Sequence, residues 1–375
     1  METHQIGQDS PTKDRLPELR ALTGLRGVAA TTVALAHFMQ FFPNGVEANS
    51  FFMWHNAVDL FFCLSGFTLS YVYSREGFQF SSYLTARIAR IYPLYFLTLI
   101  IAGAAWVLPL YVNPTTYPAG SALSDFLLQV VMINSWPVIG SGVHWNITAW
   151  SISVEWFCYV LLFPFLLVQK RLLRSSPIVL LCIVVVLSAF SYLVFLRYFD
   201  GNLSNPEVYV PKSQWSYWVS LFRGVCGFTA GWIVFASFER RDDLYALCTR
   251  FSTLIWSCVV CIVFLGYRLI NAQALVFLFP FVVLAATDPA SATSRLLGSR
   301  ALHFLGVISY SIYMVHSFVL VLFIAVFRTP WTGSLLALLV GTTFVVSAGT
   351  YFAIEVPARN AIRGIQGMRP AQLIS

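Results

Sequence analysis

Charged residues are scarce in this sequence. Asp, Glu, Lys and Arg together make up 10% of its 375 residues, whereas hydrophobic residues make up 58%. A soluble domain carries roughly 25% charged residues, which cover a surface that faces water. The composition therefore excludes an ordinary soluble globular protein and predicts that lipid covers most of the outside. Aromatic residues, at 16%, suit the belts that membrane proteins place at both interfaces.

Cysteine is also sparse, and features of exported or multidomain proteins are lacking. The seven Cys residues fall in or beside predicted spans on the inner side, so we expect no disulfides. Cys258 and Cys261 are interpreted as small apolar packing residues rather than metal ligands, and we predict no metal site and no permanently bound cofactor. Residues 1–20 are polar and contain no cleavable apolar segment, which predicts a cytoplasmic tail rather than a signal peptide. The sequence shows no internal repeat.

Apolar stretches that are long enough to cross a bilayer are numerous. A hydrocarbon core of ~30 Å requires roughly 20 helical residues. Such stretches lie at about 22–42, 57–74, 91–112, 146–168, 177–197, 215–237, 251–269, 272–287, 303–327 and 333–354. They predict an all-α polytopic membrane protein with about ten transmembrane helices, although the stretch at 272–287 is short and nearly continuous with the one before it. We divide the chain into an N-terminal tail (1–20), a transmembrane domain (21–357) and a C-terminal tail (358–375).

Basic residues are distributed unevenly around these spans. If the N-terminus is cytoplasmic, most of the 23 Lys and Arg residues fall in the two tails and in the loops on the same side, and Arg26 and Arg223 fall within spans. Lys and Arg accumulate on the cytoplasmic side of membrane proteins, so we predict that both termini are cytoplasmic. The net charge of +7 then follows from topology and indicates no nucleic-acid partner.

The first span carries two ionisable residues, Arg26 and His37. Ionisable groups inside a membrane are costly and are functional candidates for that reason. The two residues are eleven positions apart, which places them on one helix face and roughly 16 Å apart along the axis. Either they share a cavity, or Arg26 reaches the inner headgroups and His37 is a packing histidine. The small residues Gly27, Ala30 and Ala34 nearby favour the shared cavity.

Two carboxylates are further candidates. Asp59 begins the second span at the level expected for His37. It is expected either to orient the imidazole, as the third member of a catalytic triad does, or to cap its helix, and the residues leave both alternatives open. Glu155 lies near the middle of the fourth span, one helical turn from Ser151 and from Tyr159. We expect it to line a cavity rather than to be a neutral hydrogen-bonded carboxyl.

The ninth span also has a polar face. Ser309, Tyr313 and His316 recur at helical spacing, with Tyr310 next to them. Hydrogen bonding between helices is the alternative role for the hydroxyl groups, and we expect His316 to face the cavity.

An inner loop before the third span contains Arg87 and Arg90. On a helix the two would project to one side, and paired guanidinium groups bind phosphate well. Paired arginines are also typical of a cytoplasmic loop, and taken alone the residues favour that interpretation.

Five segments, in this order, resemble the membrane acyltransferase 3 family of polysaccharide and lipopolysaccharide O-acyltransferases. They are Arg26-x10-His37, LFFCLSGF at 60–67, RIARIYPLYF at 87–96, WSISVEWFCY at 150–159 and FLGVISYSIYMVH at 304–316. The resemblance implies a bacterial inner-membrane enzyme that transfers an acyl group, usually acetyl, from cytoplasmic acyl-CoA to a hydroxyl of a sugar or an envelope or exported polysaccharide. Its partners would be the lipid bilayer, acyl-CoA as co-substrate and a sugar-containing acceptor.

The resemblance also implies residue roles. His37 would be catalytic, and Arg26 together with Arg87 and Arg90 would bind the acyl donor. The family's Ser-x-Glu element falls on Ser153 and Glu155. We assign catalytic roles to His37, Asp59 and Glu155. The groups expected to line the cavity, stabilise the oxyanion or bind the acceptor are Ser65, Ser153, Tyr159, Tyr310, Tyr313 and His316.

Two other classes of protein use ionisable residues inside the membrane. A secondary transporter or a lipid-linked sugar flippase is the main alternative, but such proteins often have repeat-related halves, and none is found. A glycosyltransferase with a polyprenyl-linked donor would be expected to have acidic residues in its first outer loop, where only Glu47 and Asp59 are present.

Overall fold

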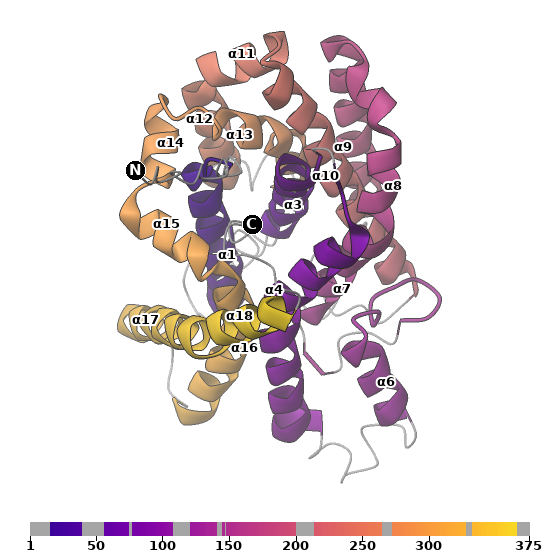
Figure 1. Ribbon diagram of the computed structural model, residues 1–375. Helices are drawn as coiled ribbons and strands as arrows, with labels where there is room; N and C mark the ends of the chain where they lie inside the picture. Colours follow the sequence, from indigo (N-terminus) through magenta and orange to yellow (C-terminus); the bar gives the residue numbers. More distant parts are fainter. Residues whose placement is uncertain are drawn as a thin grey trace, which may run out of the picture.

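The computed structural model describes residues 16–39, 56–74, 77–107, 121–140, 145–146, 148–199, 214–264, 272–327 and 332–365, and every regular element in these ranges is helical (Figure 1). The α-helices are α1 (Arg20–Met39), α3 (Ala57–Tyr73), α4 (Phe80–Ala102), α6 (Ser121–Val130), α7 (Ala149–Phe157), α8 (Phe163–Val168), α9 (Pro177–Phe199), α10 (Gln214–Arg240), α11 (Asp243–Arg250), α12 (Ser252–Phe264), α13 (Phe279–Ala285), α14 (Ala292–Leu297), α15 (Arg300–Val307), α16 (Ser309–Val326), α17 (Gly333–Thr350) and α18 (Val356–Ile365). Short π-helical or 3-10 segments are η2 (Gly103–Val107), η3 (Cys158–Leu162), η4 (Lys170–Arg174), η7 (Ala272–Phe277) and η8 (Tyr351–Glu355).

Within these ranges, six helical segments are long and apolar enough to cross a membrane, and a seventh is added if α11 and α12, bent by 65°, form one broken span. The six are Phe80–Ala105, Ala149–Val168, Pro177–Arg197, Tyr217–Arg240, Ser309–Val326 and Gly333–Gly364. Helices α1 and α3 are not among them, because Arg26 and His37 make α1 more polar and α3 has only 17 residues. The prediction of an all-α polytopic membrane protein is confirmed. The number of about ten crossings and the cytoplasmic termini stay predictions.

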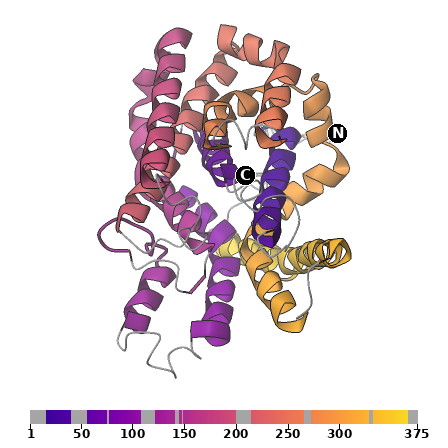
Figure 2. The same ribbon diagram turned by 180° about the vertical axis from the view of Figure 1, so that it is seen from behind.

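Helices α1 and α3 lie in the centre of the bundle, and Figures 1 and 2 show the other helices arranged around them. Helix α3 packs against α10, and α1 packs between α3 and α15. A Cβ atom at Gly66 would lie 1.9 Å from the carbonyl oxygen of Phe228, and one at Gly27 would lie 2.4 Å from the backbone nitrogen of Gly306. Such close approach requires residues without side chains. The glycines therefore bring the two motif-bearing helices into direct contact with their neighbours.

Helix α4 begins earlier than predicted. It starts at Phe80, so Arg87 and Arg90 lie inside the helix and not in a loop before it. One face of its first turns is buried and carries Tyr83, Ala86 and Arg87. Burial of one face against other helices stabilises a helix more than its local propensity does. The two arginines are therefore held on a rigid element.

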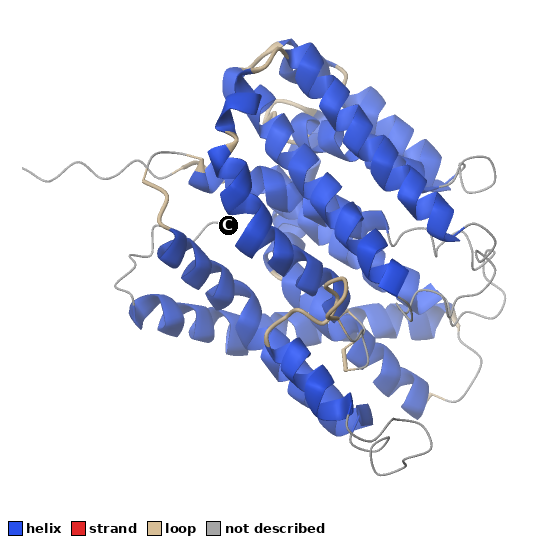
Figure 3. Cartoon of the chain, turned by 90° about the vertical axis from the view of Figure 1, so that its right-hand side faces the viewer, coloured by secondary structure: helices blue, strands red, loops and turns tan. Residues whose placement is uncertain are grey.

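One other predicted span is broken. The span at 303–327 is divided into α15 and α16 at Ile308, two residues after Gly306, a residue of low helix propensity. In the region 251–287, the described residues 251–264 and 272–287 contain α12, η7 and α13. In the side view, most of the long helices run alongside one another (Figure 3), and α17 projects from one side of the bundle in Figures 1 and 2.

Candidate active site

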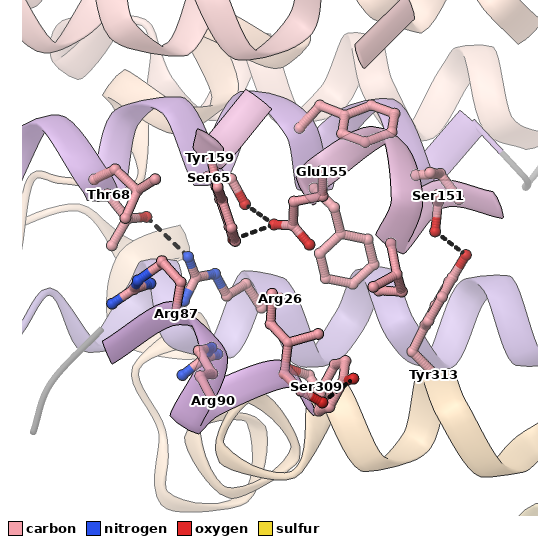
Figure 4. A pocket seen from close by; sticks show the side chains of 17 residues that line it. Arg26, Ser65, Thr68, Arg87, Arg90, Ser151, Glu155, Tyr159, Ser309 and Tyr313 are labelled. Carbon is pink, nitrogen blue, oxygen red and sulfur yellow. Dashed lines mark hydrogen bonds between the residues drawn. The ribbon is translucent and has the colours of Figure 1, made fainter. Parts of the chain in front are cut away.

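A pocket with an empty volume of about 750 Å³ lies between α1, α3, α4, α7 with η3, and α16 (Figure 4). All five segments that carry the family resemblance contribute to its wall. The polar residues that line it are Arg26, Ser65, Thr68, Arg87, Arg90, Ser151, Glu155, Tyr159, Ser309, Tyr310 and Tyr313. Figure 4 shows the three arginines at one end, the Ser151–Tyr313 pair at the other, and Glu155 between them. The pocket is therefore cationic at one end only.

Glu155 accepts two hydrogen bonds on the same oxygen. Ser65 Oγ on α3 and the Tyr159 hydroxyl, one turn further along the chain, both donate to Oε1 at 2.5 Å. Both donors were predicted cavity residues, and they lie together at the middle of the pocket. Two hydroxyl donors hold the carboxylate in a single position and satisfy part of its need for hydrogen bonds in a buried setting. The carboxylate also interacts electrostatically with Arg26.

The arginine end is built by α1, α3 and α4. Arg26 Nη2 donates to Thr68 Oγ1 at 3.0 Å, and Thr68 donates in turn to the carbonyl oxygen of Leu64. Thr68 was not among the predicted site residues. It lies one turn from Ser65 on the same helix face, and this periodicity is a signal that was present in the sequence.

Aromatic rings surround one of these arginines. The guanidinium carbon of Arg87 lies 5.6, 6.0 and 5.9 Å from the ring centroids of Tyr73, Tyr83 and Tyr159. Arg87 Nη2 also donates to the Tyr73 hydroxyl at 3.4 Å. Cation–π contacts of this kind stabilise a buried guanidinium.

The opposite end contains a hydroxyl pair. Ser151 Oγ and the Tyr313 hydroxyl lie 2.5 Å apart, and Tyr313 also reaches the carbonyl oxygen of Thr148 at 3.4 Å. The Tyr310 hydroxyl, in contrast, donates to the carbonyl oxygen of Ile91 at 2.7 Å. Since a hydroxyl has one proton, Tyr310 has already used its donor. Ser151 and Tyr313 each reach the Thr148 carbonyl oxygen only at 3.4 Å, a longer and weaker contact than that of Tyr310. One of their protons is therefore more easily redirected to a developing oxyanion.

Two histidines meet beyond this end. His316 Nε2 lies 3.1 Å from His37 Nδ1, and the His316 ring centroid is 6.0 Å from that of Tyr313. We expected His37 to share a cavity with Arg26. Within the described ranges, Arg26 lines the pocket, whereas neither histidine does, and the pair adjoins the Tyr313 end.

Their hydrogen-bond partners determine the tautomers. His316 Nδ1 lies 2.8 Å from the carbonyl oxygen of Tyr313 and 3.1 Å from that of Ile312. Because carbonyl oxygens only accept, Nδ1 carries the proton, and Nε2 of the neutral ring is an acceptor. His37 Nδ1 must then donate, both to His316 and to the carbonyl oxygen of Val33 at 3.0 Å. This assignment makes Nε2 the basic nitrogen of His37.

The prediction that Asp59 orients His37 is wrong. Both of its oxygens are bound by Arg223, with Nε–Oδ1 at 3.0 Å and Nη2–Oδ2 at 2.7 Å, and Gln273 donates to Oδ2 at 3.5 Å. Asp59 lies in the first turn of α3, and Asn56 is at the N-cap position. Arg223 lies inside a predicted span, where a cation requires a partner. This position in the sequence was the feature that could have predicted its pairing with a carboxylate such as Asp59.

Ser153 does not belong to the pocket either. Its Oγ accepts from the Ser135 backbone N–H at 3.1 Å, and its carbonyl oxygen accepts from Trp136 Nε1 at 3.0 Å. Residues two apart on a helix face different directions. Ser151 and Glu155, four apart, therefore line the pocket, whereas Ser153 anchors the segment before α7.

Comparison with known proteins identifies the family. Residues 19–353 match the family described as "Acyltransferase domain", so the chain belongs to this acyltransferase family, as the motifs predicted. It is 33% identical to "Acyltransferase MdmB" of Streptomyces mycarofaciens over 173 residues, which are 44% of this chain and 42% of that protein. It is 43% identical to "Protein 2 in picA locus" of Rhizobium radiobacter over 95 residues, which are 24% of this chain and 47% of that protein. The matches thus span less than half of either relative, and no solved structure matches the chain significantly.

Proposed function

We propose that this protein is an integral membrane O-acyltransferase of a bacterial inner membrane, which moves an acyl group, acetyl in particular, from cytoplasmic acyl-CoA to a hydroxyl of a sugar-containing acceptor. The observation that carries the proposal is the polarity of the pocket. Three arginines lie at one end, and a hydroxyl pair backed by two imidazoles lies at the other. The phosphates of one extended acyl donor would fit the arginine end, and its thioester would fit the end with the hydroxyl pair.

The donor occupies the pocket lengthwise in this proposal. Its phosphates bind Arg26, Arg87 and Arg90, because guanidinium groups form charge-assisted hydrogen bonds with phosphate oxygens. Arg26 and His37 are separated by roughly 16 Å of helix, a distance that an extended pantetheine arm spans. The thioester then lies near Tyr313 and the histidines. The bias of Lys and Arg toward the predicted inner segments supports a cytoplasmic position for the arginine end, the side on which acyl-CoA would be available.

His37 is the catalytic base of the proposed reaction. Its Nε2 takes the proton of the acceptor hydroxyl while that oxygen bonds to the thioester carbonyl carbon. The positive charge that develops on His37 is stabilised through its Nδ1–H, which His316 Nε2 and the Val33 carbonyl oxygen accept. The carbon–sulfur bond then breaks, and the CoA thiolate recovers the proton from His37. His316 thus takes the positioning role that we had expected for Asp59.

Tyr313 and Ser151 complete the reaction centre. One of these hydroxyls donates to the oxyanion of the tetrahedral intermediate, and the hydrogen bond between Ser151 on α7 and Tyr313 on α16 keeps both in place. A second route, in which His37 Nε2 takes the acyl group before passing it to the acceptor, uses the same groups. A covalent acyl-histidine trapped without acceptor would distinguish the two routes.

Purified protein in nanodiscs, supplied with acetyl-CoA and sugar acceptors, tests the proposal through release of free CoA thiol and acetylation of the sugar. Loss of a general base lowers rates by roughly 10²–10⁴-fold, so we expect His37→Ala to lower kcat by that factor and to leave the affinity for CoA unchanged. Full transfer by His37→Ala would refute the catalytic assignment. Movement of a sugar across proteoliposomes without thiol release would instead support the transporter or flippase alternative.

A further inference from the structure

A second chamber adjoins the arginine end of the pocket. It has an empty volume of about 910 Å³ and is lined by residues 16–19 and by parts of α1, α3, α4, α15, η8 and α18. Arg26, Thr68 and Arg90 line both cavities. These three residues therefore stand at the junction between the second chamber and the pocket that contains Glu155. A ligand longer than the pocket would extend into this chamber.

The chamber brings in a further arginine from near the C-terminal end of the chain. Arg359 on α18 lines it, and its guanidinium carbon lies 5.9 Å from the ring centroid of Tyr351. Arg359 Nη2 donates to the Tyr351 hydroxyl at 3.5 Å, and its Nε is buried with no hydrogen-bond partner among the described residues. Arg359 lies beyond residue 353, where the match to the family ends.

Positive charge accumulates around this junction. Arg90 interacts electrostatically with Arg26, Arg87 and Arg359, and the buried Arg363 on α18 interacts with three of these residues. Like charges in a partly desolvated site repel one another and are stabilised by a bound anion. A cluster of five arginines from three helices is therefore arranged for a ligand with several negative charges.

Two carboxylates near the second chamber hydrogen-bond to residues outside the arginine cluster. Glu355 accepts from Ser311 and interacts electrostatically with Arg90 and Arg359, and Glu18 contacts His303 at 2.5 Å. Among the described residues, no carboxylate forms an ion pair with Arg26, Arg90 or Arg359. The charge of these three arginines is directed to the two cavities.

We propose that the second chamber is the binding site for the phosphates of the nucleotide part of the acyl donor, and that Arg359 binds one of those phosphates together with Arg90. The acyl-bearing arm passes from the chamber into the pocket at the junction that Arg26, Thr68 and Arg90 line. This inference rests on acyl-CoA as the donor of the proposed function. It extends the donor site from the Arg-x-x-Arg motif to α18, beyond the residues that match the family.

The test compares two donors on the full-length protein in nanodiscs. Acetyl-CoA carries the phosphates, and S-acetylpantetheine has the same thioester arm without them. Loss of one charge-assisted contact corresponds to roughly tenfold or more in Kd, so we expect Arg359→Ala to weaken acetyl-CoA binding by that factor. S-acetylpantetheine binding should not change. The control is Arg300→Ala, which removes an exposed arginine that lines neither cavity and should affect neither donor.

Each other result overturns the inference. Unchanged acetyl-CoA affinity in Arg359→Ala would show that Arg359 does not contact the donor. An equal loss for both donors, or a lower unfolding temperature that accounts for it, would show that Arg359 acts through folding. If the unsubstituted protein binds acetyl-CoA no better than S-acetylpantetheine, the phosphates have no site in this chain. If it binds neither, the proposed donor is wrong, and the inference fails with it.

Discussion

Replacing His316 with Ala removes the imidazole nitrogen that lies 3.1 Å from His37 Nδ1. The hydrogen bond is strongest in the transition state of the proposed reaction, when His37 becomes positively charged. A hydrogen bond to a charged group contributes about 1.5–3 kcal/mol. Loss of that energy only in the transition state lowers kcat by about 10- to 150-fold. The Val33 carbonyl oxygen still accepts from His37 Nδ1, which is why we expect less than the full loss of His37→Ala.

Steady-state release of CoA thiol measures this effect. KM for acetyl-CoA should stay unchanged in His316→Ala, because His316 does not line the pocket that contains the three arginines. His316→Gln is the matched variant, since its side-chain oxygen is an acceptor near the position of Nε2. We expect it to restore at least tenfold of the lost kcat, an effect of the size of one charged hydrogen bond.

Three results would refute this reasoning. His316→Ala with the original kcat would show that the His37–His316 contact has no role in the reaction. Equal losses in the Ala and Gln variants would show that packing of the buried ring, and not its acceptor nitrogen, is what matters. A rise in KM with constant kcat would place His316 in binding and not in positioning of the base.

Two further predictions concern buried polar contacts. Asp59→Ala leaves the Arg223 guanidinium buried without its partner and should lower the free energy of unfolding by about 3–5 kcal/mol. We expect kcat per folded molecule to stay unchanged. A loss of kcat at constant stability would show that Asp59 acts in the reaction. Glu155→Ala deprives the Ser65 and Tyr159 hydroxyls of their acceptor and should cost about 1–3 kcal/mol of stability. Glu155→Gln keeps an acceptor and should recover most of the stability that Glu155→Ala loses, as measured by thermal unfolding. Equal losses of stability in the two variants would contradict the hydrogen-bond argument.

Several parts of the site were predicted from helical periodicity or from the family motifs. Ser65, Glu155 and Tyr159 were predicted cavity residues, and they form one hydrogen-bonded group in the pocket. Arg87 and Arg90 were assigned to the donor through the family motif, and the structure puts them beside Arg26. Helical spacing determines which side chains share a face, so residues of one segment could be grouped without knowledge of the fold.

Contacts between segments could not be predicted in this way. Asp59 was matched to His37 by its expected depth in the membrane. In the structure it faces α10 and binds Arg223. The reason is that the close contact at Gly66 sets the rotation of α3 against α10. Ser153 was assigned by its place in a motif, and its direction on α7 takes it out of the pocket.

The amino-acid sequence by itself determined the class of fold and the family, because scarcity of charge, apolar length and motif order are properties of the chain. It also determined which residues of α1, α3, α4, α7 and α16 could face a common cavity. Only the tertiary structure decided which faces meet. It paired His37 with His316 and brought Arg359 to the arginine end. These pairings depend on how helices distant in the sequence pack and rotate against each other, and helical periodicity within one segment contains no information about its neighbour.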